Sequence, residues 1–113
     1  MIINKEKTLS AFADDEDIFF SIIDEFINNF ENQKNELIST LDKKNTDEIR
    51  ICVHTIKGLS ATFYFEPLRS IAAEAEAAAK EGKLEVVDQL REELISKFDE
   101  LYKDARRISN EQG

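Results

Sequence analysis

The stretch DIFFSIIDEFINNFENQKNELISTL, residues 17–41, carries a strong helical pattern from which the fold can be worked out. Its apolar side chains recur every three or four residues, which places them on one face of an α-helix. The pattern consists of Ile18, Ile22, Phe26 and Phe30 together with Phe19, Ile23 and Ile27, and it continues through Leu37, Ile38 and Leu41. Acidic residues at positions 14–17 precede it, where the helix dipole favours negative charge. We therefore predict a helix over residues 15–43.

Three more helices follow from the same periodicity. Thr46 is predicted to cap the second helix, whose apolar positions are Ile49, Cys52, Val53, Ile56 and Phe63, with Ser60 among them. After a break at residues 64–66, Pro67 fits the first turn of a third helix, which Gly82 ends. The fourth helix carries Val87, Leu90, Leu94, Phe98, Leu101 and Ala105. Residues 1–8 show no clear period and are expected to form a loose end, a short packing arm or a short helix.

The predicted joins between these helices are short, so neighbouring helices should run antiparallel. Four helices with one apolar stripe each close most simply as an up-down four-helix bundle. The expected fold class is therefore all-α, with one domain over residues 1–113 and its core at about residues 10–107.

Composition excludes several classes of function. A formal net charge of −9 argues against binding nucleic acid or an anionic membrane surface. No apolar run has the length of a membrane span, and the N-terminus lacks the features of a signal peptide. Cys52 is the single cysteine, which suits a reducing cytoplasm, and no cluster has metal-ligand spacing. We expect a cytoplasmic monomer that holds neither a metal nor another cofactor.

One position on the second predicted helix has the character of a chemical site. His54 lies about 140° around the helix from the centre of the apolar stripe and should face solvent. Its helical neighbours are Arg50, Lys57, Gly58 and Ala61. A glycine within a helix costs about 1 kcal/mol relative to alanine, and close approach of another molecule would offset that cost. The pattern thus combines an exposed nucleophile, a nearby cation and room for a partner.

The sequence HTIKGLSA, residues 54–61, resembles the H-x-x-K-G-x-[SA] motif of histidine phosphotransfer domains, the helical relay modules of two-component phosphorelays. The continuation TFYFEPL, residues 62–68, is similar to the phosphoacceptor domains of chemotaxis histidine kinases. The resemblance covers roughly residues 10–105. It implies a phosphorelay intermediate that accepts a phosphoryl group on His54 and exchanges it with the aspartate of a receiver domain, in a response regulator or a hybrid sensor kinase.

The same resemblance assigns roles to other residues. It makes Lys57 the lysine of the motif and Gly58 the small residue beside the ring. In the chemotaxis branch a glutamate on the next helix accepts a hydrogen bond from the histidine, and Glu76 is the matching position here, with an ordinary surface carboxylate as the alternative. Such domains are phosphocarriers without catalytic apparatus of their own, and the receiver supplies Mg²⁺.

Tyr64 departs from the family pattern, which usually has glycine at this position to end the histidine helix. A left-handed backbone is cheap for glycine and costly for tyrosine, so we expect either a reshaped turn or a longer helix. Two alternative functions stay open. The chain could be a detached phosphoacceptor domain of a chemotaxis-type kinase, or a helical adaptor that docks partners through the same face without phosphorylation.

Overall fold

The computed structural model describes residues 2–111, and within that range it contains five helices and no strand. Their bounds are α1 Lys5–Ala11, α2 Glu16–Lys43, α3 Thr46–Thr62, α4 Glu66–Lys80 and α5 Leu84–Glu111. The all-helical prediction is confirmed, and the predicted limits of the first long helix agree with α2 to within one residue. The last helix runs well beyond its predicted apolar stripe in both directions.

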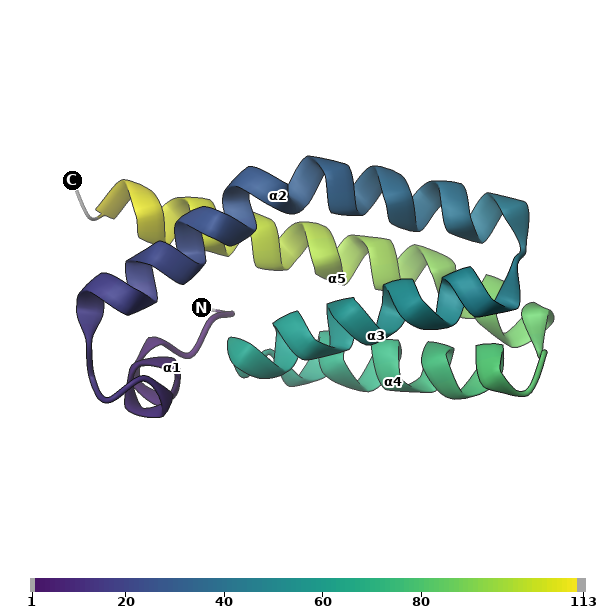
Figure 1. Cartoon of the computed structure of the whole chain (residues 1–113), viewed down its shortest axis with the longest axis horizontal. Coiled ribbons are helices and arrows are strands. Elements are labelled where there is room, and N and C mark those ends of the chain that lie inside the picture. The colour runs from purple at the N-terminus through teal and green to yellow at the C-terminus, as the bar shows by residue number, and fades with distance from the viewer. Residues whose placement is uncertain (1, 112–113) are drawn as a thin grey trace.

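The four long helices lie lengthwise beside one another, and each runs opposite to the one before it (Figure 1). Helix α3 packs against α4, α4 against α5, α5 against α2, and α2 against α3. The molecule measures 43 × 22 × 20 Å along its principal axes. The short helix α1 lies near the end of the molecule where α2 begins and α3 ends (Figure 1).

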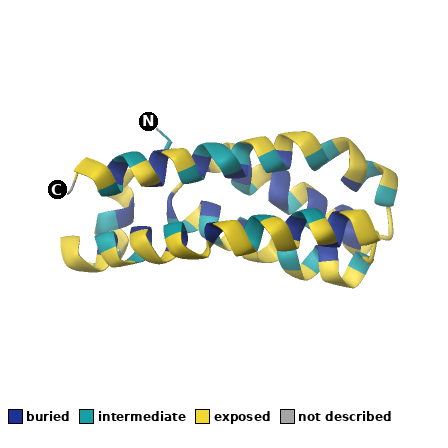
Figure 2. Ribbon diagram, turned by 90° about the horizontal axis from the view of Figure 1, so that it is seen from above, coloured by how far each residue is buried: buried dark blue, intermediate teal, exposed yellow. Residues whose placement is uncertain are grey.

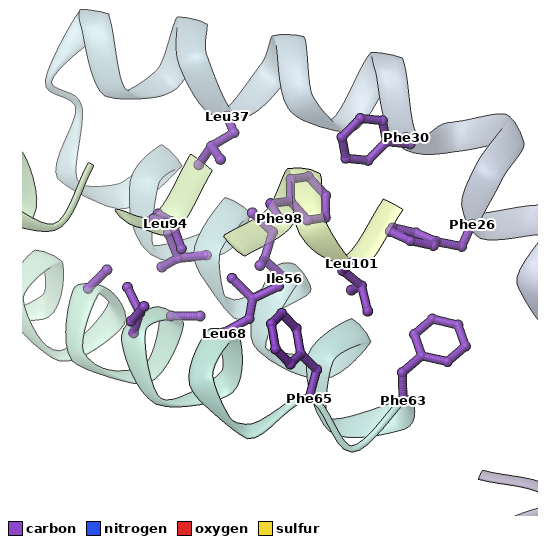
Figure 3. Close-up of a cluster of buried hydrophobic side chains, with 14 of the residues drawn as sticks. Phe26, Phe30, Leu37, Ile56, Phe63, Phe65, Leu68, Leu94, Phe98 and Leu101 are labelled. Carbon is purple, nitrogen blue, oxygen red and sulfur yellow. The ribbon is translucent and has the colours of Figure 1, made fainter. Parts of the chain in front are cut away.

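The core follows the apolar stripes that the sequence predicts. Buried positions recur along one side of each long helix and turn toward the other helices (Figure 2). Phe26 and Phe30 of α2 point inward with Phe98 of α5, and Phe63 packs beside Phe26 (Figure 3). The stripe is incomplete at its start, because Ile18 is 43% exposed.

Side-chain caps fix where two of the long helices begin. The carboxylate of Asp15 accepts hydrogen bonds from the amides of Asp17 and Ile18 and thereby caps α2. The predicted cap at Thr46 is wrong. Asn45 caps α3 instead, because its side-chain oxygen accepts from the amide of Glu48, and Thr46 is the first helical residue.

The N-terminal segment forms a packed arm and a short helix rather than a loose end. A single carboxylate oxygen of Asp104 on α5 accepts hydrogen bonds from the amides of Ile2 and Ile3, at 3.1 and 2.7 Å. The amide of Asn4 donates to the carbonyl of Phe63, so the arm also joins the turn after α3. Asp104 and Ile3 are both buried.

Neither outcome expected for Tyr64 occurs. The helix ends at Thr62, and Tyr64 itself adopts the left-handed backbone conformation, with φ of 57°. The amide of Phe65 donates to the carbonyl of Ser60, and the amide of Tyr64 to that of Ala61, which is the hydrogen-bond pattern of a Schellman helix end. The turn therefore keeps the geometry that suits glycine, at a cost of about 1–2 kcal/mol for a residue with a Cβ.

Candidate functional site

His54 projects from the outer face of α3, as the periodicity of the helix predicts. Val53 and Ile56, its neighbours on the apolar stripe, are buried, whereas the side chain of His54 is 67% exposed. The imidazole is therefore accessible to a macromolecular partner, while the helix that carries it is fixed by the core. This combination of a rigid support and an open side chain suits a group that must be approached from solvent.

Glu76 of α4 reaches across to the imidazole. Its Oε2 lies 2.6 Å from Nδ1 of His54, a short hydrogen-bond distance. A carboxylate can only accept, so we assign the ring proton to Nδ1. The other ring nitrogen, Nε2, then carries the lone pair, and it points away from Glu76 because the two nitrogens lie on opposite sides of the ring. In the neutral ring, Nε2 is thus the nitrogen that keeps a free lone pair.

Lys57 binds the same carboxylate. Its Nζ lies 2.5 Å from Oε1 of Glu76, so His54 and Lys57 share one acceptor, each on its own oxygen. The hydrogen bond from Lys57 is the main reason why the pKa of Glu76 lies below its ordinary value; burial opposes that shift and the hydrogen bond from His54 adds to it. Glu76 is 15% exposed and remains ionised at neutral pH, because its charge is paired.

The surface beside the imidazole is open. A Cβ added at Gly58 would meet nothing within 4 Å, and the backbone of Gly58 is not in the left-handed region. Neither core packing nor backbone strain therefore requires glycine at this position. Ala61, one turn further along, is also exposed, so α3 presents a low surface on the C-terminal side of His54.

Two other residues that the sequence analysis named, Arg50 and Cys52, take no part in this hydrogen-bonded unit. Arg50 lies half-buried one turn before His54, and among residues 2–111 its side chain makes no hydrogen bond or ion pair. Cys52 is partly buried, and burial together with the negative charge of Glu36 raises the pKa of its thiol to about 11. The thiol is therefore protonated at neutral pH and is not a competing nucleophile.

Sequence reasoning missed one residue at the site. Ile51 lies three positions before His54 on the same face of α3 and is 60% exposed. The sequence did contain a signal for it, because Ile51 is an apolar residue that lies outside the buried stripe of its own helix.

Within the described range no group of His, Cys, Asp and Glu side chains is arranged to hold a metal ion. No helix among residues 2–111 is both long and apolar enough to cross a bilayer.

The arrangement suits reversible capture of an electrophile at Nε2. When Nε2 forms a new bond, the imidazole becomes a cation that keeps its proton on Nδ1, and the Glu76 carboxylate lies where that charge develops. Lys57 lies three positions after His54 on α3, and its ammonium group is held by Glu76 on the Nδ1 side of the ring. Roles for these residues in phosphoryl chemistry stay a prediction.

Comparisons with known proteins give a family and a similar fold. The family model described as "Hpt domain" matches residues 21–106. The fold is similar to the crystal structure of histidine-containing phosphotransfer protein B from Pseudomonas aeruginosa PAO1, with a TM-score of 0.84, 20% sequence identity, and coverage of 97% of this chain and 96% of that chain. At this identity the likeness concerns the fold. The comparison with curated proteins gives no match.

Proposed function

This chain belongs to the Hpt domain family, and on that premise we propose that it carries phosphoryl groups on Nε2 of His54 and exchanges them with the aspartate of a receiver domain. The observation that carries the assignment is the hydrogen bond of 2.6 Å between Nδ1 of His54 and Glu76. In the neutral ring this hydrogen bond leaves the lone pair on Nε2, on a side chain that is 67% exposed. No other histidine is present in the chain to take this role.

The transfer step needs no proton donor on this chain. Nε2 attacks the phosphorus of an aspartyl phosphate, the N–P bond forms, and the bond from phosphorus to the aspartate oxygen breaks. The leaving aspartate keeps the electron pair of that bond. The ring keeps its proton on Nδ1, where Glu76 stabilises the resulting positive charge. In the reverse direction a receiver carboxylate attacks the phosphorus and the neutral imidazole leaves.

The role of this chain is that of a phosphocarrier and not a catalyst. The site offers a nucleophile, an orienting carboxylate and one cation, and we place the Mg²⁺ that such transfers use in the partner receiver. We also interpret α2 to α5 as an antiparallel up-down four-helix bundle. Their alternating directions and mutual contacts support that interpretation (Figure 1). The bundle serves the proposed function because it holds α3 and α4 in the register that pairs His54 with Glu76.

A detached phosphoacceptor domain of a chemotaxis-type kinase is the second candidate. The His54–Glu76 hydrogen bond favours it, because a glutamate in this position is what that resemblance implies. The two candidates share the chemistry on His54 and differ in the phosphodonor. A kinase ATP-binding domain that labels the protein from ATP would favour the second, and a phosphorylated receiver that labels it would favour the first.

The proposed chemistry is tested by labelling with phosphoramidate and with a phosphorylated receiver. The parent protein should acquire an acid-labile, base-stable phosphoryl group. His54→Gln should acquire none, while its helicity and melting temperature stay close to those of the parent. Label on a folded His54→Gln protein would overturn the assignment. A parent protein that takes label from neither donor, yet binds a receiver, would instead favour the adaptor.

A further inference from the structure

Arg50 differs from the other arginines of this chain because its guanidinium group has no partner side chain among residues 2–111. The other four each donate a hydrogen bond to a side chain: Arg69 to Glu66, Arg91 to Asp42, Arg106 to Tyr102 and Arg107 to Asp104. Arg50 is also half-buried, so its charge has lost part of its hydration without gaining a counter-charge. An anion bound at this position would supply that counter-charge.

The place of Arg50 on α3 brings it close to His54. It lies one helical turn before the histidine, and the Cβ atoms of such a pair are about 5–6 Å apart, a gap that the long arginine side chain can cross. Side chains on a helix lean toward its N-terminus, so the ring of His54 extends over the turn of Arg50 and not over the turn of Lys57. A group bound to Nε2, the nitrogen that Glu76 leaves free, is therefore within reach of Arg50.

The charges already paired at the site leave a phosphoryl group short of positive charge. Lys57 forms an ion pair with Glu76, so these two side chains neutralise each other. A phosphoryl group carries roughly two negative charges at neutral pH, and the positive charge of the modified ring offsets one of them. Apart from His54, the ionised side chains of residues 50–58 are Arg50 and Lys57. Arg50 is thus the cation beside the ring that is not already paired.

Acidic side chains on the neighbouring turns and helices do not hold Arg50. Asp47 is exposed three positions before it on α3, and no ion pair joins the two within the described part of the chain. Glu36 of α2 borders the opposite flank of α3, where it lines a hollow with Ile51. At the end of α4, Glu81 pairs with Lys83. The guanidinium group therefore remains open to an anion on the histidine.

We propose that Arg50 binds the phosphoryl oxygens of phosphorylated His54 and thereby stabilises the phosphoryl group on Nε2. The inference rests on the proposed function of His54. The planar guanidinium group would donate charge-assisted hydrogen bonds to two of the oxygens, a geometry that arginine provides and lysine does not. The same contact would form with the phosphoryl oxygens of an incoming donor, so Arg50 should assist the labelling step as well as hold its product.

The direct test follows the Nε–H group of Arg50 by ¹H–¹⁵N NMR while phosphoramidate labels the full chain. Phosphoramidate transfers its phosphoryl group to Nε2 and releases ammonia. The Arg50 resonance should move to a new position in the phosphorylated protein. The resonance of Arg106, which lies on α5 and donates to Tyr102, should stay in place. An Arg50 resonance that does not move on phosphorylation would overturn the contact.

The titration of the phosphoryl group tests the same contact from its other side. A nearby cation favours the dianion and lowers the phosphoryl pKa, so Arg50→Gln should raise the midpoint of a ³¹P titration by about half a pH unit. Arg50→Lys keeps the charge and should stay closer to the parent. Arg106→Gln is the matched control, because it removes an equal charge from another helix. It should leave the midpoint unchanged.

Labelling rates complete the test. Arg50→Gln should take label from phosphoramidate roughly two- to fivefold more slowly than the parent, as expected for the loss of one exposed charge pair. Its melting temperature should match that of the parent, because Arg50 has no partner in the unmodified protein. A phosphoryl midpoint that is unchanged in Arg50→Gln, or one that Arg106→Gln raises equally, would overturn the role of Arg50 and leave His54 untouched. A parent protein that takes no label from phosphoramidate or from a phosphorylated receiver would overturn both inferences.

Discussion

Oε2 of Glu76 lies 2.6 Å from Nδ1 of His54, so a side chain of α4 determines which nitrogen of a ring on α3 is free to react. The same carboxylate holds Lys57 through its other oxygen. Three side chains from two helices therefore form one unit, and a change in any of them should affect the other two.

Without the Glu76 carboxylate, the imidazole of His54 should no longer be held in a single tautomer. In the parent we expect the proton on Nδ1, and in Glu76→Ala we expect a mixture, because no acceptor then selects one nitrogen. The ¹⁵N chemical shifts of the imidazole measure this directly. Labelling by phosphoramidate should become slower in the variant. Glu74→Ala, an exposed neighbour on α4, is the control and should leave both readouts unchanged.

Lys57→Ala removes the cation that lies one turn after His54 on α3. We predict slower transfer or a shorter lifetime of the phosphohistidine, because the phosphoryl oxygens lose a charged partner. The free energy of unfolding should fall by only about 0.5–1 kcal/mol, because the half-buried Lys57 loses its ion pair with Glu76 but not its place on the helix. Lys103→Ala on α5 is the control. If rate and lifetime both matched the parent, Lys57 would serve only as the ion-pair partner of Glu76.

Gly58→Gln should separate docking from folding. A Cβ at this position meets nothing within 4 Å, so the variant should be at least as stable as the parent, with a gain of up to about 1 kcal/mol. The long side chain stands one turn after His54 and should strongly slow transfer with a receiver, with less effect on phosphoramidate. Gly58→Ala is the matched control for helix propensity. A destabilised Gly58→Gln protein that transfers normally would mean that the glycine serves the fold.

The left-handed backbone of Tyr64 predicts which of two substitutions at this position gives the more stable protein. Because φ of Tyr64 is 57°, Tyr64→Gly should be more stable than Tyr64→Ala by about 1 kcal/mol, the cost of placing a Cβ in the left-handed region. Both variants lose the ring, so their contact with the ammonium group of Lys7 cancels in the comparison. Urea unfolding gives the difference directly. Equal stabilities would show that this turn relaxes in solution.

Asp104 should make the N-terminal arm sensitive to acid. Burial alone would raise its pKa, but hydrogen bonds from the amide of Ile3, the side chain of Arg107 and the amide of Ile2 bring that pKa below its ordinary value. A lowered carboxyl pKa stabilises the fold above the unfolded value of about 3.9, and this contribution is lost as the pH falls through the folded value.

Asp104→Asn should therefore lower the free energy of unfolding at pH 7 by about 1 kcal/mol or more, because the amide oxygen can still accept from Ile2 and Ile3, but the charge and the hydrogen bond from Arg107 are lost. The difference from the parent should be smaller in strong acid, below the lowered pKa of the native carboxyl group, than at pH 7. Asp88→Asn, an exposed position on α5, is the control. A difference that stays constant between the two pH values would contradict the role of the charge.

The local pattern of the sequence was sufficient for the helices and for the exposure of His54. Both follow from a repeat of 3.6 residues, which is a property of one segment at a time. The grouping of His54, Lys57 and Gly58 could also be predicted, because these residues lie about one turn apart on a single helix. The cap at Asn45 was misassigned because Asn45 and Thr46 are both good capping residues, and the sequence alone does not decide between neighbours.

The periodicity of the sequence is enough to predict an all-helical chain with one exposed histidine beside a lysine and a glycine. The packing of the helices establishes that Glu76 reaches His54, that Asp104 binds amides 101 and 102 residues away, and that Tyr64 keeps a turn suited to glycine. Periodicity fixes which face of a helix is buried. Periodicity does not say how far one helix is shifted along its axis relative to its neighbour. The packing of the whole core sets that shift, and it does so closely enough for side chains on two helices to form a hydrogen bond.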